Sequence, residues 1–186
     1  NLMADLHTNW DVPNAIKIAR ALKEYNVNWV EDPVRPNVEA LTHFRNEVKV
    51  PLATGETMGS ASNYLPFLQK GLIDYMMFDP VWIGGITEAL RAGAIADAHQ
   101  IPVSIHDCNG PVNLTVGTNL SLAMTNSCTY ETARGFYYGW YHELLEELPL
   151  IENGFITPLK GDGLGVKLKE KWLDKKNSII IESKEN

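Results

Sequence analysis

Hydrophobic and polar positions along the chain follow two alternating patterns. Short apolar runs, typical of buried strands, are each followed by a longer stretch in which apolar residues recur at helical spacing. Six strands are predicted, at 2–5, 28–31, 50–56, 74–79, 101–106 and 128–131. Helices are predicted at 12–25, 38–47, 60–70, about 85–99 and 112–125. The chain therefore reads as consecutive strand–helix units.

Strands separated by helices of this length favour parallel pairing with right-handed crossovers, in a doubly wound sheet or a barrel. A doubly wound sheet normally has a glycine-rich phosphate loop after its first strand, and residues 5–10, "DLHTNW", do not resemble one. The segment "GDGLGVK" at 161–167 lies late in the chain, outside a strand-to-helix junction, and is interpreted as a glycine-rich turn.

The alternation ends near Pro149. Residues 1–148 are predicted to form a partial barrel domain, and residues 149–186, which finish with the apolar run "SIII", an extended segment packed on another surface. Because the chain opens directly into a strand without an initiator methionine, we expect it to be the later part of a longer protein.

Charge and cysteine content narrow the classes of partner. Sixteen basic and 23 acidic residues give a formal net charge of -7, and the charges are scattered rather than gathered in blocks. This disfavours nucleic acid or an anionic membrane as the main partner. Cys108 and Cys128 have no metal-binding spacing and are predicted to be buried, reduced thiols. No apolar run approaches the roughly 20 residues of a membrane span.

Ionisable residues stand where the predicted strands end. They are Asp5 with His7 beyond it, Glu31, Glu56, Asp79, His106 and Glu131. Taken singly, an acid after a strand is often the N-cap of the next helix, and a lone histidine is more often structural than catalytic. In a parallel barrel, however, all these strand ends open on one face. Clustered carboxylates raise each other's pKa, so a bound cation is the expected counterion.

The chemistry of the cluster points to a hard cation and a general base. Asp5, Glu31 and Glu56 offer the oxygen ligands that suit Mg²⁺. His106 and Asp79, on neighbouring predicted strands, could form a dyad in which the carboxylate fixes the tautomer of the imidazole and raises its basicity.

Several short motifs occur in an order that resembles a known family. They are "MAD", "VEDP", "ATGE", "MMFDPVWIGGITEA", "VSIHDCNGPV" and "YE", followed by "ENGFITPLKGDGLGV". The set resembles the enolase superfamily, in its mandelate racemase/muconate lactonizing enzyme family. The resemblance implies an α/β fold of the (β/α)8 TIM-barrel type, modified to (β/α)7β. The N-terminal cap domain and the first barrel strands of that fold have no counterpart in this sequence.

The resemblance also implies roles for the strand-end residues. Asp5, Glu31 and Glu56 match the Mg²⁺ ligands, Asp79 and His106 the general-base dyad, and Glu131 the acid of the last strand. His7 lies where acid-sugar dehydratases of the galactonate type carry a general acid. The implied reaction removes the C2 proton of an aldonate or aldarate and eliminates the C3 hydroxyl, giving a 2-keto-3-deoxy acid. Such a protein is expected to be a lyase acting on a small sugar acid, homo-oligomeric and cytoplasmic.

Two alternatives stay open from the sequence. A racemase, epimerase or cycloisomerase of the same superfamily would exchange the C2 proton without losing a hydroxyl group. An inactive fragment would fold only as part of an assembly and would not bind Mg²⁺.

Overall fold

A computed structural model describes residues 1–174, 176 and 179 of the chain. The contact pattern divides these residues into two compact units. The first consists of residues 1–106 and 120–131, and the second of residues 107–119 and the described residues from 132 onward. The chain thus leaves the first unit after 106, returns for 120–131 and ends in the second.

The first unit is built on a six-stranded parallel sheet in the order β1-β2-β3-β4-β5-β6. The strands are β1 Ala4–Asp5, β2 Val30–Glu31, β3 Leu52–Thr54, β4 Tyr75–Phe78, β5 Val103–Ile105 and β6 Ser127–Tyr130. Each strand pairs in parallel with the next one in the sequence, as in a half-barrel. The predicted α/β class and all six predicted strands are confirmed; β1 to β5 are shorter than predicted, and β6 begins and ends one residue earlier.

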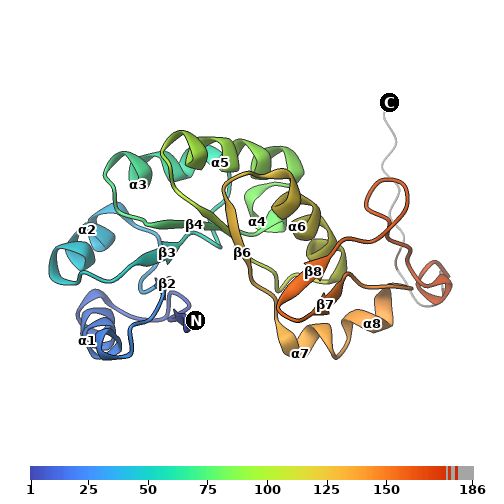
Figure 1. The fold of residues 1–186 in the computed structure, drawn as a ribbon, viewed down its shortest axis with the longest axis horizontal. Helices are drawn as coiled ribbons and strands as arrows, with labels where there is room; N and C mark the ends of the chain where they lie inside the picture. Colours follow the sequence, from blue (N-terminus) through green and yellow to red (C-terminus); the bar gives the residue numbers. More distant parts are fainter. Residues whose placement is uncertain (175, 177–178, 180–186) are drawn as a thin grey trace. The chain divides into compact units, whose positions relative to one another are not determined.

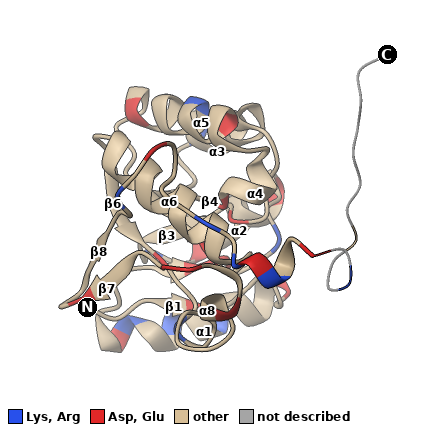
Figure 2. Cartoon of the chain, turned by 90° about the vertical axis from the view of Figure 1, so that its right-hand side faces the viewer, with Lys and Arg blue, Asp and Glu red and all other residues tan. Residues whose placement is uncertain are grey.

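Helices follow each of the first four strands, and the longer ones lie on the outer side of the sheet (Figure 1). They are α1 Val12–Leu22 with η1 Lys23–Tyr25, α2 Val38–Glu47, η2 Ala61–Tyr64, α3 Leu65–Gln69, α4 Pro80–Ile83 and α5 Ile86–Ala98. Asp11 and Asn37 begin α1 and α2 by accepting hydrogen bonds from the amides of Asn14 and Ala40. Acidic and basic segments are interspersed along α5 rather than gathered in one block (Figure 2).

The helix predicted at 60–70 is divided into η2 and the short α3. Pro66 lies in the first turn of α3. Proline has no amide proton, so at this position it cannot donate the hydrogen bond that would continue an α-helix from the preceding turn. A continuous α-helix through this segment is therefore disfavoured, and the first turn forms as a 3-10 helix.

The middle strands are buried along their whole length. All residues of β3 and β5 are buried, as are three of the four in β4. Side chains such as Leu52, Met76, Phe78 and Ile105 are fully shielded from solvent. This explains why the sequence shows continuous apolar runs rather than alternation, since strands of a parallel sheet are covered on both faces.

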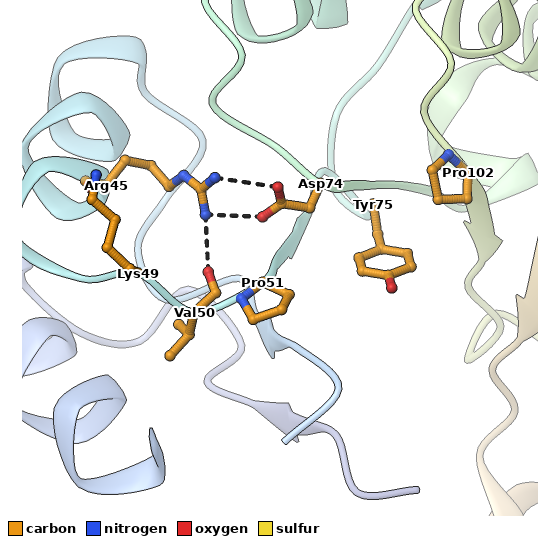
Figure 3. Close-up of a pocket in the computed structure, with 7 residues that line it drawn as sticks. All are labelled: Arg45, Lys49, Val50, Pro51, Asp74, Tyr75 and Pro102. Carbon is orange, nitrogen blue, oxygen red and sulfur yellow. Dashed lines mark hydrogen bonds and ion pairs between the residues drawn. The ribbon is translucent and has the colours of Figure 1, made fainter. Parts of the chain in front are cut away.

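An ion pair joins α2 to the amino-terminal end of β4 (Figure 3). Arg45 of α2 contacts both carboxylate oxygens of Asp74 at 2.9 and 3.2 Å and donates to the carbonyl of Val50 at 2.9 Å. Asp74 also accepts from the amide of Leu52 at 2.8 Å. These bonds fasten α2 to the starts of β3 and β4. Arg45 and Asp74 also line an open hollow of about 500 Å³, so their charged groups are already paired with each other there.

The described residues of the second unit form short helical segments and a β-hairpin. Its elements are the start of α6 Pro111–Ala123, α7 Arg134–Tyr137, α8 Tyr141–Leu144, β7 Leu150–Glu152, β8 Phe155–Thr157 and η3 Glu170–Trp172. Strands β7 and β8 are antiparallel and joined by Asn153 and Gly154, both at positive φ. The sequence prediction gave only an extended segment here, although Asn-Gly is a strong hairpin signal. The apolar run at 178–181 lies outside the described residues except for Ile179.

Two further predictions concern the cysteines and membrane spans. Cys128 is exposed and Cys108 half-buried, so the prediction of two buried thiols is wrong. Cys128 lies on β6, the last strand of the sheet, and its sulfur is 3.2 Å from the carbonyl oxygen of Val103 on β5. Within the described residues, no helix has the length and apolar character needed to cross a bilayer.

Candidate active site

Backbone register brings the strand-end residues to one edge of the sheet. Asp5 of β1 pairs with Glu31 of β2, so these carboxylates stand side by side on adjacent parallel strands. Glu56 follows β3, Asp79 follows β4, His106 follows β5 and Glu131 follows β6. The amides of His106 and Glu131 still donate to the neighbouring strand, at 3.0 and 2.9 Å, which continues the sheet to those positions.

His106 and Asp79 form a buried hydrogen-bonded dyad. Nδ1 of His106 lies 2.8 Å from Oδ2 of Asp79, and both side chains are almost fully buried. The other oxygen of Asp79 accepts from the amide of Val81 at 2.8 Å and caps α4. Asp79 therefore acts both as the N-cap of α4 and as the partner of His106, because each of its two carboxylate oxygens has a different partner.

The imidazole of His106 is strongly basic. Burial opposes its protonation, but the hydrogen bond with Asp79 and the charges of Glu56 and Glu131 outweigh burial and raise its pKa to about 9. Trp82 of α4 stacks on the imidazole, with ring centroids 5.2 Å apart and planes 20° apart. The indole thereby limits the orientations available to the base.

Glu56 lies between two imidazoles. Its Oε2 is 3.3 Å from Nε2 of His106, and its Oε1 is 3.1 Å from Nδ1 of His7. Burial raises the pKa of Glu56, while the neighbouring imidazoles lower it in part. The carboxylate thus links the histidine of the first strand to that of the fifth.

His7 is held by the carboxylate of Asp5. Its amide donates to Oδ1 of Asp5 at 2.6 Å, and its Nδ1 lies 3.8 Å from the other oxygen of the same carboxylate. Both His7 and Thr8 adopt positive φ, which is uncommon for residues other than glycine. The side chain is 59% exposed, so an imidazole at the site is accessible from solvent.

Glu31 is buried and Glu131 is half-buried, and the pKa of each acid is raised. Oε2 of Glu31 accepts from the indole of Trp29 at 3.0 Å. Burial and then Glu131 raise the pKa of Glu31, and burial is also the main cause of the raised pKa of Glu131. Within the described part of the chain, Oε1 of Glu31 and Oε2 of Glu131 have no hydrogen-bond partner. Such buried oxygens are costly unless a proton or a cation satisfies them.

These observations fit a divalent cation. Ligand atoms of Glu56, His106 and Glu131 lie within 4.8 Å of one another. This group shares only Glu56 with the predicted ligands, but Asp5 and Glu31 belong to the same charge cluster, because the charge of Asp5 raises the pKa of both Glu31 and Glu56. Within the described residues, one buried carboxylate oxygen each of Glu31, Glu56 and Glu131 has no hydrogen-bond partner, and such oxygens are the donors that a hard cation requires.

A small cavity adjoins the carboxylates. It measures about 180 Å³ and is bounded by β1, β2, β5 and β6. Its walls include Asp5, Glu31 and Glu131 together with Trp29 and Ser104. The site therefore combines a charged rim with partly apolar walls.

The backbone before Glu56 is fixed by residues that the sequence did not single out as functional. Asp32, fully buried, accepts from the hydroxyl of Thr54 and from the amide of Gly55 at 3.1 Å. Tyr64 donates its hydroxyl to the carbonyl of Gly55 at 2.7 Å. Gly55 has φ +117°, and a Cβ there would lie 2.6 Å from the Tyr64 ring. The "VEDP" and "ATGE" motifs contained signals for the first three residues, but none identified Tyr64.

The chain matches the family described as "Enolase C-terminal domain-like" over residues 1–172. It is 29% identical to the D-xylonate dehydratase of Haloferax volcanii over 165 residues, covering 88% of this chain and 40% of that protein. It is 28% identical to the D-gluconate/D-galactonate dehydratase of Picrophilus torridus over 176 residues, covering 94% and 45%.

Among solved structures, an enolase of the mandelate racemase subgroup from Agrobacterium tumefaciens, which contains a succinimide residue, is 35% identical with a TM-score of 0.84. The match covers 91% of this chain and 46% of that one. The chain therefore spans less than half the length of these relatives. The family match and the half-barrel together show that the chain belongs to the enolase superfamily, in its mandelate racemase/muconate lactonizing enzyme family.

Proposed function

We propose that the chain belongs to a Mg²⁺-dependent acid-sugar dehydratase, which converts an aldonate or aldarate to a 2-keto-3-deoxy acid. The observation that carries the proposal is the placement of His106 and His7 on opposite oxygens of one carboxylate, Glu56. An elimination needs a base for the C2 proton and an acid for the departing C3 hydroxyl. The two imidazoles supply both, and the dehydratase names of the relatives agree with this reaction.

His106 is the general base. Asp79 bonds to Nδ1 of His106, which leaves Nε2 to take the proton from C2 of the substrate. Trp82 keeps the ring in this orientation through stacking. Because the neighbouring carboxylates raise the pKa of His106 to about 9, neutralising their charge brings the base closer to the operating pH.

His7 is the general acid. It is exposed on a turn anchored to Asp5, so it can receive a proton from solvent and pass it to the C3 hydroxyl, which then leaves as water. The enol product takes up a proton at C3 to give the keto acid. The electrons of the C2–H bond form the C2–C3 double bond as the C3–O bond breaks, so no external oxidant is needed.

Asp5, Glu31 and Glu56 are the proposed Mg²⁺ ligands. The bound ion would supply Lewis-acid stabilisation of the substrate carboxylate as the C2 proton leaves. Glu131 is the proposed hydrogen-bond donor to the developing oxyanion, a role that requires its protonated form and agrees with the direction in which burial shifts its pKa. The substrate is a small sugar acid and the assembled protein a homo-oligomer.

The test uses the full-length protein that contains this chain, with Mg²⁺ and a panel of aldonic and aldaric acids. Formation of a 2-keto acid from a stereoisomer in the panel is the expected result. His106→Asn should abolish both this product and exchange of the C2 proton with D₂O. His7→Asn should abolish dehydration but leave C2 exchange, and His43→Asn, on the exposed side of α2, is the matched control.

Exchange at C2 without a keto product would refute dehydration and favour a racemase or epimerase. A ring-opened or lactonised product would favour a cycloisomerase. No reaction and no Mg²⁺ binding would favour the inactive alternative. Full dehydration by His7→Asn would show that another group protonates the leaving hydroxyl.

A further inference from the structure

The loop that follows His106 carries an Asn-Gly pair. Asn109 is exposed, whereas Gly110, immediately before α6, is buried. In an Asn-Gly sequence the backbone nitrogen of glycine can attack the side-chain carbonyl carbon of asparagine, because no side chain on the glycine shields that nitrogen. The product is a five-membered succinimide ring, formed with loss of ammonia. The slow requirement is removal of the amide proton from the attacking nitrogen.

A buried proton relay begins at that amide. The Gly110 N–H donates to the hydroxyl oxygen of Tyr141 at 3.1 Å, and the Tyr141 hydroxyl donates to Oδ2 of Asp107 at 3.0 Å. Asp107 is buried, and its Oδ1 accepts from Nδ2 of Asn113 at 3.1 Å. All these residues belong to the second unit. The amide therefore connects through one phenol to a carboxylate.

The direction of the relay suits proton removal. Tyr141 is fully buried, and burial and then the charge of Asp107 raise its pKa, so the phenol stays protonated and acts as a donor to the carboxylate. It can pass its own proton to Asp107 while accepting the proton of Gly110. No free phenolate forms in such a transfer, and the negative charge moves from a buried carboxylate to the attacking nitrogen.

We propose that Asn109 is a self-modification site at which the chain forms a succinimide with Gly110. The bond between the Gly110 nitrogen and Cγ of Asn109 forms, and the amide proton passes through Tyr141 to Asp107. The bond from Cγ to the side-chain nitrogen then breaks, and this nitrogen takes a proton from water and leaves as ammonia. Asp107 returns its proton to solvent. No oxidant or co-reactant is consumed, and later addition of water opens the ring to aspartate or isoaspartate.

The backbone at Gly110 supports this assignment. Its φ is +118°, a conformation that other residues rarely adopt, so the backbone favours glycine at the position where glycine also speeds succinimide formation. Opening of the ring to isoaspartate would insert an extra methylene into the main chain three residues after His106. The modification would therefore change the loop that directly follows the proposed general base.

The hairpin turn provides an internal reference. Asn153-Gly154 has the same dipeptide in the exposed link between β7 and β8. Among the described residues, no side-chain hydroxyl is hydrogen-bonded to the Gly154 amide. Both dipeptides experience the same solvent, temperature and time, so the ratio of their conversion rates isolates the effect of the local structure.

The experiment is incubation of the folded chain at mildly alkaline pH, followed by peptide mass spectrometry and isoaspartate detection. We expect Asn109 to lose ammonia several-fold faster than Asn153. Tyr141→Phe, which keeps the ring but removes the relay, should slow conversion at Asn109 about tenfold and leave Asn153 unchanged. Tyr137→Phe removes another buried phenol of the same unit, which donates to Pro149 at 2.9 Å, and should leave the Asn109 rate unchanged.

An intact Asn109 in wild-type chain whose Asn153 is converted would overturn the proposal. So would an unchanged or faster rate at Asn109 in folded Tyr141→Phe. Should Tyr141→Phe unfold, Asp107→Asn tests the same relay at its far end and should also slow Asn109. These outcomes do not depend on dehydratase activity, since no substrate or metal takes part.

Discussion

Replacing Glu31 by glutamine should stabilise the metal-free chain at alkaline pH. Glu31 is buried beside Asp5 and Glu131, and its carboxylate must be charged in this environment once the pH exceeds its pKa. Glutamine keeps the size of the side chain. It also keeps an oxygen that can accept the hydrogen bond that the Trp29 indole donates to Glu31 at 3.0 Å. The substitution therefore removes the charge with little change in packing.

The magnitude follows from the pKa. Burial, with Glu131, raises the pKa of Glu31 from 4.5 to about 8. The protonated form is thus favoured in the folded state, so the stability that Glu31 contributes is complete below pH 4.5 and is lost as the pH rises to 8. A tenfold change in proton affinity is worth about 1.4 kcal/mol, which gives an upper bound of about 5 kcal/mol. Because Glu131 competes for protons in the same cluster, we expect a gain of about 1–3 kcal/mol.

The assay is urea unfolding with a metal chelator present, followed by circular dichroism, at pH 4.5 and near pH 8. Glu31→Gln should unfold at a higher urea concentration near pH 8 and at the wild-type concentration at pH 4.5. Glu24→Gln, an exposed change in η1, should have no effect at either pH. Added Mg²⁺ should stabilise the wild type more than Glu31→Gln. A variant less stable than the wild type near pH 8 would refute the charge-cluster reasoning.

Three other substitutions test how the site is held. Tyr64→Phe removes the hydrogen bond to Gly55 and should cost about 1–2 kcal/mol in urea unfolding. Gly55→Ala places a Cβ 2.6 Å from the Tyr64 ring at a positive φ and should cost more than about 3 kcal/mol, measured by the same method. Asp11→Ala removes the cap of α1 and should cost about 1 kcal/mol while leaving Mn²⁺ affinity, measured by electron paramagnetic resonance, unchanged. Equal stability of Gly55→Ala and wild type would contradict the proposed tight packing, and a change in Mn²⁺ affinity in Asp11→Ala would contradict the separation of α1 from the site.

The parallel sheet was predictable because its signals are local. Apolar runs such as 74–79 identify buried strands, and the ionisable residue at the end of each run marks the edge where a parallel sheet collects side chains. Pairing of Asp5 with Glu31 then follows from chain order, because each strand pairs with its neighbour in the sequence. The parallel order of the strands was therefore enough to predict that the candidate site residues lie at one edge of the sheet.

Features that depend on packing at a distance could not be read from the sequence in this way. The hydroxyl of Tyr64 reaches the carbonyl of Gly55 only because η2 turns back over the end of β3, and neither residue type identifies that contact. The position of Trp82 three residues after Asp79 does not indicate what its ring contacts, and only the structure places the ring on the imidazole of His106. The hairpin at Asn153-Gly154 is a different case, since its signal was present in the dipeptide and was not used.

The contacts of Glu56 connect cation binding with the state of the base. In the metal-free chain, its two oxygens lie within 3.3 Å of the imidazoles of His7 and His106. A divalent cation on the same carboxylate would neutralise its charge and weaken the attraction that raises the pKa of His106. The imidazole would then lose its proton more readily, while Asp79 still holds Nδ1. Nuclear magnetic resonance titration of His106 should therefore show a lower pKa with Mg²⁺ than without it, and an unchanged pKa would place the ion away from Glu56.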